Sequence, residues 1–305
     1  MNKERGIKRS IVAALALVGI TALFIAWAIH SPAQVQAFLI RLVVVSLIIF
    51  LGILFLRFFA LLWFGYLQHA EADLTERPAA ELPPVSVIVP AYNEEAVLDR
   101  AIESLLAMDY PTYEIIVVDD GSTDRTLEVA RRWEGVGGGV DVRVFTKRNG
   151  GKARALNAGI GQARYPLILC MDADSWMEPQ SMKAAMRHFE DPNVGAVAGN
   201  VKVENRKALF GRLQALEYIQ GLNMPRRAQG FLGAVNIVPG PIGIFRKEAL
   251  EEVGLYDTDT FAEDADLTMK LLTAGWKVVY EDQSITWTSA PENVLDLIQQ
   301  RYRWT

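Results

Sequence analysis

The chain has 305 residues, of which 51% are hydrophobic, and its formal net charge at pH 7 is -5. This acidic balance gives no reason to expect nucleic-acid binding, because it does not supply the basic surface that a phosphate backbone requires. Cys170 is the only cysteine, so an internal disulfide is excluded and a reducing compartment is compatible. The hydrophobic residues are concentrated in the N-terminal quarter, which indicates a membrane region followed by a globular part.

Two long apolar segments predict two transmembrane helices within residues 1–69, over about 11–29 and 42–66. Each segment is long enough to cross a hydrocarbon core of roughly 30 Å. Four basic residues precede the first segment, whereas the connection between the two offers only Arg41, so the N-terminus is expected in the cytoplasm. Two crossings then return the rest of the chain to the cytoplasmic side. A cleaved secretory signal is the alternative for the first segment, and the second apolar run argues against it.

Residues 70–84 are polar and rich in Pro and Ala, which predicts a short linker before a globular domain at 85–305. In that domain short apolar runs alternate with segments of helical spacing. The predicted strands are 85–89, 115–118, 140–145, 167–171, 194–203 and 237–245, and the predicted helices are 95–108, 124–133, 153–163, 209–220 and 266–274. This alternation predicts an α/β domain with a Rossmann-like, mostly parallel sheet that is covered by helices on both faces.

Polar residues follow three of the predicted strands, at the edge where open parallel sheets bind ligands. The segment that ends in Asn93-Glu94 follows the first strand, and Asp120 follows the second; alone, these could cap a helix or form a turn. Asp172 and Asp174 leave a later strand together, and two carboxylates in this arrangement can share a hard divalent cation. An isolated Asp-x-Asp is more often an ordinary turn, so the pair gains weight only from its position.

Two further groups lie near the C-terminus. Glu263-Asp264 precede a predicted helix, which on its own indicates ordinary capping. Gln300, Arg303 and Trp304 stand at i, i+3 and i+4 on a final helix that begins near Pro291, so they share one face. An indole can stack on a sugar ring and a guanidinium can grip phosphate oxygens, although a core tryptophan beside surface charges would give the same pattern. The three histidines lie away from every motif, so any general base is expected to be a carboxylate.

These motifs occur in one order along the chain: Asp119-Asp120, Asp172-Ala173-Asp174, Glu263-Asp264 and Gln300-x-x-Arg303-Trp304. From about Val85 to Trp304 the sequence resembles the processive family 2 glycosyltransferases, which include the synthases of hyaluronan, chitin, cellulose and poly-N-acetylglucosamine. The resemblance implies a GT-A fold and an inverting, metal-dependent transfer of a sugar, expected to be N-acetylglucosamine, from a UDP-sugar. The acceptor would be a growing β-linked polysaccharide, or a lipid-linked acceptor, at the cytoplasmic face of the cell membrane.

The resemblance also implies a role for each motif residue. Nucleotide contacts are implied for Tyr92, Glu94, Asp120, Lys152 and Asp172, although Lys152 alone could be a solvated surface charge. Asp174 together with Asp172 would hold Mg2+ or Mn2+, and Asp264 beside Glu263 would act as the general base. Gln300, Arg303 and Trp304 would serve the acceptor and the diphosphate. The family's usual Thr-Glu-Asp stands here as Ala262-Glu263-Asp264, so no role for a threonine hydroxyl is expected.

Relatives normally continue into further membrane helices, so the domain is expected either to be cut short of them or to obtain them from other membrane subunits. One alternative is a transferase that moves a single sugar onto polyprenyl phosphate, which does not require Gln300, Arg303 and Trp304. Another is a catalytically inactive, nucleotide-binding membrane regulator. A nicotinamide dehydrogenase is disfavoured, because no Gly-x-Gly-x-x-Gly follows the first strand.

Overall fold

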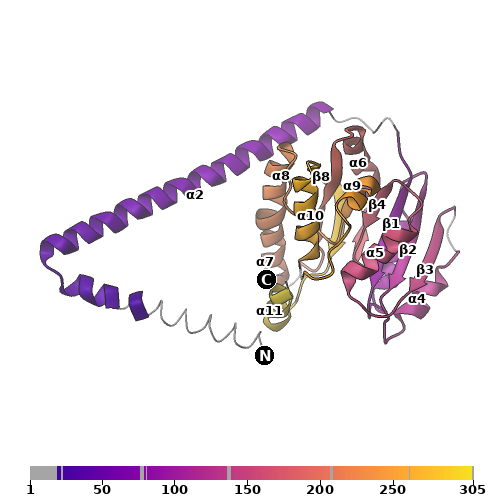
Figure 1. Cartoon of the computed structure of the whole chain (residues 1–305), viewed down its shortest axis with the longest axis horizontal. Coiled ribbons are helices and arrows are strands. Elements are labelled where there is room, and N and C mark those ends of the chain that lie inside the picture. The colour runs from indigo at the N-terminus through magenta and orange to yellow at the C-terminus, as the bar shows by residue number, and fades with distance from the viewer. Residues whose placement is uncertain are drawn as a thin grey trace. The chain divides into compact units, whose positions relative to one another are not determined.

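The computed structural model describes residues 19–21, 23–75, 79, 81–135, 139–206, 209–260 and 262–303. It divides into two compact units, Met1–Ala60 and Leu61–Thr305. The first unit is helical where it is described, and its long helix α2 (Ala33–Thr75) continues into the second unit (Figure 1).

Among the described residues, one helix is long and apolar enough to cross a membrane, over Ala33–Ala70 of α2. Most of its apolar side chains are exposed, as expected of a helix whose surroundings are lipid. The predicted span at 42–66 lies inside this helix, and the helix extends to Thr75, into the predicted linker. A shorter apolar helix covers Gly19–His30, and much of the predicted first span at 11–29 lies outside the described residues. The described part of the chain therefore shows one long apolar helix in place of the two predicted spans.

The second unit is built on an eight-stranded sheet with the order β3-β2-β1-β4-β7-β6-β8-β5. The strands are β1 (Val85–Ala91), β2 (Tyr113–Asp119), β3 (Asp141–Thr146), β4 (Leu167–Cys170), β5 (Ser175–Met177), β6 (Val194–Val203), β7 (Gly243–Arg246) and β8 (Lys277–Thr288). Only β5 and β7 run antiparallel to their neighbours, so the predicted mostly parallel sheet is confirmed.

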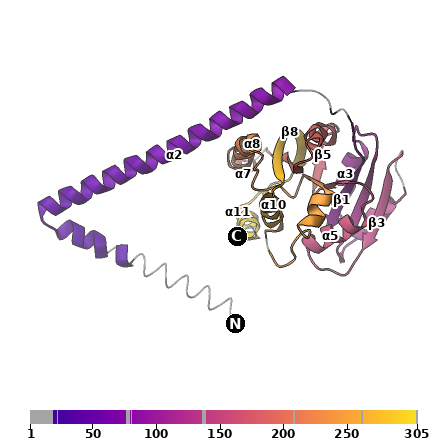
Figure 2. The ribbon, with the colours of Figure 1, turned by 45° about the horizontal axis from the view of Figure 1, so that its top comes forward.

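Helices cover both faces of this sheet (Figures 1 and 2). They are α3 (Leu98–Leu106), α4 (Thr126–Arg132), α5 (Lys152–Gln162), α6 (Ser181–Ala185), α7 (Leu209–Glu217), α8 (Met224–Phe231), α9 (Lys247–Glu252), α10 (Glu263–Thr273) and α11 (Val294–Arg303). Along β1, Val87 and Val89 pack into one apolar core with α3, whereas Ile88 packs into the opposite core with α5 and α10. Every residue of β1 and β2 is buried, as expected where helices cover a parallel sheet on both faces.

Several elements differ from the sequence prediction. β7 begins at Gly243 instead of residue 237, because Pro239 and Pro241 have no N–H to donate to a ladder and the segment between them forms a loop. β8 was not predicted, since charged residues interrupt its apolar pattern. The helix predicted over 209–220 continues through a π-helix at Tyr218–Asn223 into α8.

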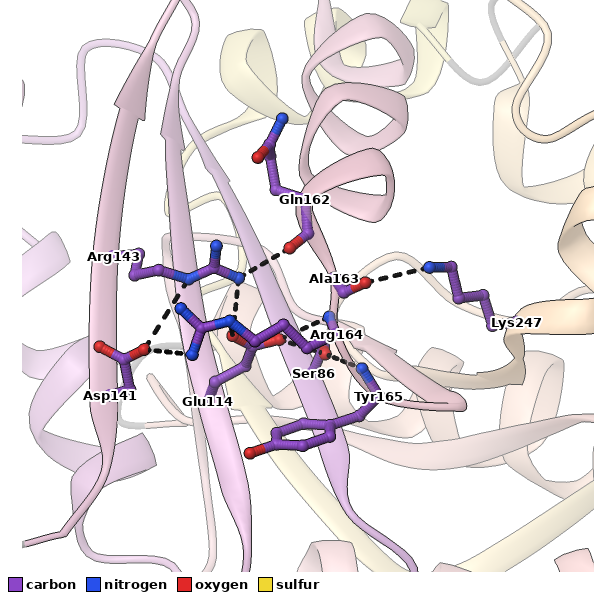
Figure 3. Close-up of polar contacts among 9 residues, drawn as sticks. All are labelled: Ser86, Glu114, Asp141, Arg143, Gln162, Ala163, Arg164, Tyr165 and Lys247. Carbon is purple, nitrogen blue, oxygen red and sulfur yellow. Dashed lines mark hydrogen bonds and ion pairs between the residues drawn. The ribbon is translucent and has the colours of Figure 1, made fainter.

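A buried charge cluster closes the sheet at the edge where β1 and β2 begin (Figure 3). The carboxylate of Glu114 is fully buried and accepts hydrogen bonds from Ser86 Oγ at 2.6 Å, Arg143 Nη2 at 2.6 Å and the backbone N–H of Arg164 at 2.8 Å. Arg164 also pairs with Asp141 at 2.6 Å. The cluster ties β1, β2, β3 and the end of α5 together, on the side of the sheet opposite to the predicted ligand site.

Candidate active site

The loops after β1 and β2 are joined through Asn93. Its backbone adopts a left-handed conformation, with φ of 56°, and its N–H donates to Ser122 Oγ at 3.0 Å. Its side-chain Oδ1 accepts the N–H of Thr123 at 2.8 Å. Asn93 therefore does not cap a helix, since α3 begins only at Leu98. Instead it holds together the two loops on which the predicted nucleotide contacts Tyr92, Glu94 and Asp120 lie.

Asp120 follows β2 and is only 3% exposed. Its carboxylate accepts hydrogen bonds from Lys147 Nζ at 2.5 Å and from the backbone N–H groups of Gly150 at 3.1 Å and Gly151 at 2.7 Å. Gly121 fits under this loop because it has no side chain: a Cβ there would lie 2.7 Å from the backbone N of Asn149. Asp120 thus positions the loop that leads into α5 and its first residue, Lys152.

Lys152 connects two of the predicted motifs. Its ammonium lies 2.7 Å from Asp172 Oδ1 and 3.6 Å from Glu263 Oε1. The pKa of Lys152 is raised, because the attraction of Asp172, Asp264 and Glu263 outweighs the effect of burial, which by itself would lower it. The lysine is therefore a fixed positive charge between the carboxyl end of β4 and the start of α10.

Gly240, between Pro239 and Pro241, marks the point where these groups meet. A Cβ placed on Gly240 would lie 2.5 Å from Lys152 Nζ, 2.9 Å from Asp264 Oδ2 and 3.1 Å from Asp172 Oδ2. Three side chains that are separated by up to 112 positions in the sequence therefore surround one backbone position. The sequence did not predict this position for Gly240, which stood out only as part of a Gly-Pro-Ile-Gly segment. The two prolines that flank it favour an extended loop and were the only feature of the sequence that pointed to it.

Asp264 lies in the first turn of α10 and accepts a backbone hydrogen bond from Gly240. Burial raises the pKa of Asp264 to about 6, the charge of Lys152 opposes this rise, and Glu263 and Asp172 add to it. The position at a helix N-terminus would by itself lower the pKa, so burial and the neighbouring carboxylates are the stronger influences. A carboxylate with this pKa is ionised at neutral pH and is a better proton acceptor than an ordinary aspartate.

Asp174 and Glu94 lie on the same edge and carry poorly compensated negative charge. Burial raises the pKa of Asp174, and the charge of Asp172 raises it further. The pKa of Glu94 is raised to about 7, first by burial and then by repulsion from Asp174, Asp172 and Asp124. A divalent cation would relieve this repulsion, and carboxylate oxygens are its preferred ligands. The described residues hold no group of three or more His, Cys, Asp or Glu side chains arranged around a metal, so a cation would also need oxygens from the substrate.

The C-terminal helix α11 contributes Gln300 to this region. Gln300 and Asp174 line a cavity of about 1000 Å³ together with Asn205 and Glu292. Within the described part of the chain, the Oε1 of Gln300 is buried and has no hydrogen-bond partner. Trp304 and the side chain of Arg303 lie outside the described residues.

The structure therefore brings Lys152, Asp172, Glu263 and Asp264 together, with Asp174 and Glu94 within electrostatic range of Asp172. Tyr92 is 47% exposed beside them. The carboxylate of Asp120 is bound by Lys147, Gly150 and Gly151, and its predicted contact with a nucleotide stays a prediction.

Comparison with known proteins identifies the family of the chain. Residues 86–254 match the family described as Glycosyl transferase family 2. The chain is 32% identical over 247 residues to the poly-beta-1,6-N-acetyl-D-glucosamine synthase of Staphylococcus aureus, which covers 80% of this chain and 60% of that protein. It is 34% identical over 222 residues to the synthase of the same name from Staphylococcus epidermidis, covering 72% and 53%. The chain thus spans less than two thirds of the length of these relatives.

Two solved structures share the fold. The mannosyltransferase PcManGT from Pyrobaculum calidifontis, in complex with GDP-Man and Mn2+, superposes with a TM-score of 0.64 at 26% identity, covering 80% of this chain and 69% of that one. Residues 1–349 of TarS from Staphylococcus aureus, in complex with UDP-GlcNAc, superpose with a TM-score of 0.53 at 21% identity, covering 69% and 60%. The second likeness concerns the fold alone.

Proposed function

The chain belongs to glycosyltransferase family 2, and on that premise we propose that it transfers N-acetylglucosamine from a UDP-sugar to a growing β-linked polysaccharide. The observation that carries the proposal is the meeting of Lys152, Asp172 and Asp264 around Gly240. This arrangement places a proton acceptor beside a cation and a carboxylate suited to a metal. The choice of sugar rests on the staphylococcal poly-beta-1,6-N-acetyl-D-glucosamine synthases.

Asp264 is the proposed general base. It would accept the proton of the acceptor hydroxyl as that oxygen attacks the anomeric carbon and UDP departs from the opposite face. One such displacement inverts the anomeric configuration and yields a β-linkage from an α-linked donor. Glu263, adjacent to Asp264, helps to keep Lys152 in place and raises the pKa of Asp264, which strengthens the base.

The donor would lie along the carboxyl ends of β1, β2 and β4. The proposed nucleotide contacts are Tyr92, Glu94, Asp120, Lys152 and Asp172. Asp120 also holds the loop before Lys152. Asp174 and Asp172 would hold Mg2+ or Mn2+, which supplies charge neutralisation for the departing diphosphate. The repulsion among the carboxylates at this edge supports such a cation, and PcManGT was solved with Mn2+.

The acceptor would occupy the cavity beside Gln300. Gln300, Arg303 and Trp304 would serve the acceptor and the diphosphate. The apolar helix α2 would anchor the domain to the membrane, with the catalytic domain on the cytoplasmic side.

The test is to incubate membranes that contain the chain with a panel of labelled UDP-sugars and Mg2+ or Mn2+, and to size the product. We expect UDP-N-acetylglucosamine to give UDP release and a β-linked polymer. Transfer of a single sugar to a lipid would favour the polyprenyl phosphate alternative. Absence of UDP release with every donor would favour an inactive regulator and contradict the proposal.

A further inference from the structure

Arg226 on α8 is a buried cation outside all of the sequence motifs. It is 5% exposed, and within the described part of the chain its Nη1 atom is buried without a hydrogen-bond partner. The adjacent Arg227 provides a contrast, because it forms an ion pair with Asp282 and its side chain is 36% exposed. Two neighbouring arginines on one helix are thus in opposite states, one paired near the surface and one buried with an unused donor.

The surroundings of Arg226 place it at the candidate active site. Asp264, Tyr280 and Tyr218 lie within electrostatic range of its guanidinium, and Tyr218 is in turn within range of Asp174. A π-helix at Tyr218–Asn223 leads directly into α8, and such irregular turns are frequent at functional sites. Arg226 therefore lies within electrostatic range of the proposed base, and Tyr218 lies within range of both Arg226 and Asp174.

The charge of Arg226 requires an anionic partner. Burial lowers its pKa only to about 10, so the guanidinium stays charged at neutral pH. A buried charge without a hydrogen-bonded partner is strongly unfavourable. Lys152, the other cation at the centre of the site, already contacts Asp172 and Glu263. Among the species of the proposed reaction, sugar hydroxyls are neutral and the diphosphate carries full negative charge, so the diphosphate compensates this cation best.

We propose that Arg226 binds the diphosphate of the nucleotide-sugar donor and of the departing nucleotide. This role rests on the proposed glycosyl transfer and adds to it a residue of α8, on the side of the site away from the loops after β1 and β2. A guanidinium presents paired N–H donors that match phosphate oxygens, which a lysine at the same position would match less well.

Nucleotide affinity provides the first test. The full chain in detergent is titrated with UDP and with uridine in the presence of Mn2+, comparing the parent with Arg226→Met, Arg226→Lys and the matched control Arg227→Met. We expect Arg226→Met to weaken UDP binding about 10- to 100-fold, the range for a lost hydrogen bond to a charged group, and to leave uridine binding unchanged. Arg226→Lys should recover part of the loss, and Arg227→Met should bind UDP like the parent.

Thermal unfolding distinguishes a ligand-binding role of Arg226 from a structural one. If Arg226 stabilised the fold, Arg226→Met would lower the unfolding midpoint of the ligand-free protein. Because Arg226 is an unpaired buried charge before the ligand enters, Arg226→Met should keep or raise the unfolding midpoint of the ligand-free protein. The same variant should show a smaller rise of that midpoint on adding UDP. Arg227→Met, which breaks an ion pair, should keep the full UDP-dependent rise.

Three results would overturn the proposal: UDP binding of Arg226→Met equal to the parent, equal weakening of UDP and uridine, or a lowered ligand-free midpoint. Unchanged UDP affinity with lost turnover would assign Arg226 to the acceptor or the base instead. If the parent chain itself binds neither UDP nor another nucleoside diphosphate, the proposed function fails. That failure is visible before any variant is compared.

Discussion

Buried carboxylates have opposite surroundings at the two ends of the parallel strands. At the edge where β1 and β2 begin, the buried Glu114 has a donor for each oxygen, from Ser86, Arg143 and the backbone of Arg164 (Figure 3). At the edge where the strands end, the pKa values of Asp264, Asp174 and Glu94 are all raised, first by burial and then by neighbouring carboxylates.

This difference distinguishes carboxylates that stabilise the fold from carboxylates that are able to bind a cation or a proton. A carboxylate surrounded by donors stabilises the fold and has no capacity left for a substrate. Carboxylates that are buried without enough donors raise the free energy of the free protein, and that energy is recovered when a cation or a proton arrives. Perturbed pKa values gathered at one edge therefore identify the active site more reliably than the count of acidic residues does.

The largest effect on activity is expected for a substitution of Asp264. Asp264→Asn should lower sugar transfer by roughly 10²- to 10⁴-fold, the usual contribution of a general base, while metal-dependent UDP binding is kept. UDP release and UDP affinity are the two measurements. Asp266→Asn on the same helix is the control, since Asp266 pairs with Lys270 at 3.0 Å. Full activity of Asp264→Asn would show that another group accepts the proton.

A substitution in the Glu114 cluster should lower the stability of the fold. Glu114→Ala removes the acceptor of the Ser86 hydroxyl and of the backbone N–H of Arg164, and the buried ion-pair partner of Arg143, so the free energy of unfolding should fall by about 3–5 kcal/mol. Denaturant unfolding of the second unit measures this change, and the fraction that remains folded should bind UDP normally. Asp141 belongs to the same cluster, but its side chain is 45% exposed. Asp141→Ala should therefore lower the free energy of unfolding much less than Glu114→Ala does. Equal losses for the two variants would contradict the distinction.

Gly240 tests the geometry between the motifs. A methyl group there would displace Lys152 Nζ, Asp264 Oδ2 or Asp172 Oδ2, so Gly240→Ala should lower turnover by roughly 100-fold with little loss of stability. Gly161→Ala on α5 is the control, because a Cβ at that position has no atom within 4 Å. Parent-like turnover of Gly240→Ala would mean that these groups do not act together.

The smallest expected effect is on the pH profile. Asp264 accepts a proton only in its ionised form, and its pKa of about 6 means that this form is lost as the pH falls. The value of kcat/KM should therefore be flat above about pH 7 and should fall about tenfold per pH unit well below pH 6. Rates measured from pH 5 to 8 check this. A fall that begins near pH 4 would indicate a base with an ordinary carboxylate pKa.

The sequence predicted the sheet and most of the motif positions because buried parallel strands are continuous apolar runs and their ends carry the polar residues. Asp172 could be placed for this reason and Asp264 by the helix predicted after it, although their closeness to Gly240 depends on a loop with no periodic signal. The residues of β8 were missed because Glu281 is charged, and its burial depends on Arg187 and His188, which lie far away in sequence.

Arg226 could not be recognised from the sequence for a similar reason. It is next to Arg227 on a short polar helix, and only the fold determines that one of the two side chains is buried and the other is exposed. The partners of Asp120 were also hidden from the sequence, because Lys147, Gly150 and Gly151 come from a loop whose path the sequence does not reveal.

The hydrogen bonds of Asp120 also affect when conformational freedom is lost. Residues 147–151 are held against β2 by one carboxylate, so they take up their shape as the chain folds and do not wait for a nucleotide. A nucleotide-sugar that enters the site finds Lys152 already in position. Ordering the protein therefore reduces the binding affinity less. Association should then be limited by diffusion and steric access, and a variant that frees this loop should slow binding before it changes the chemistry.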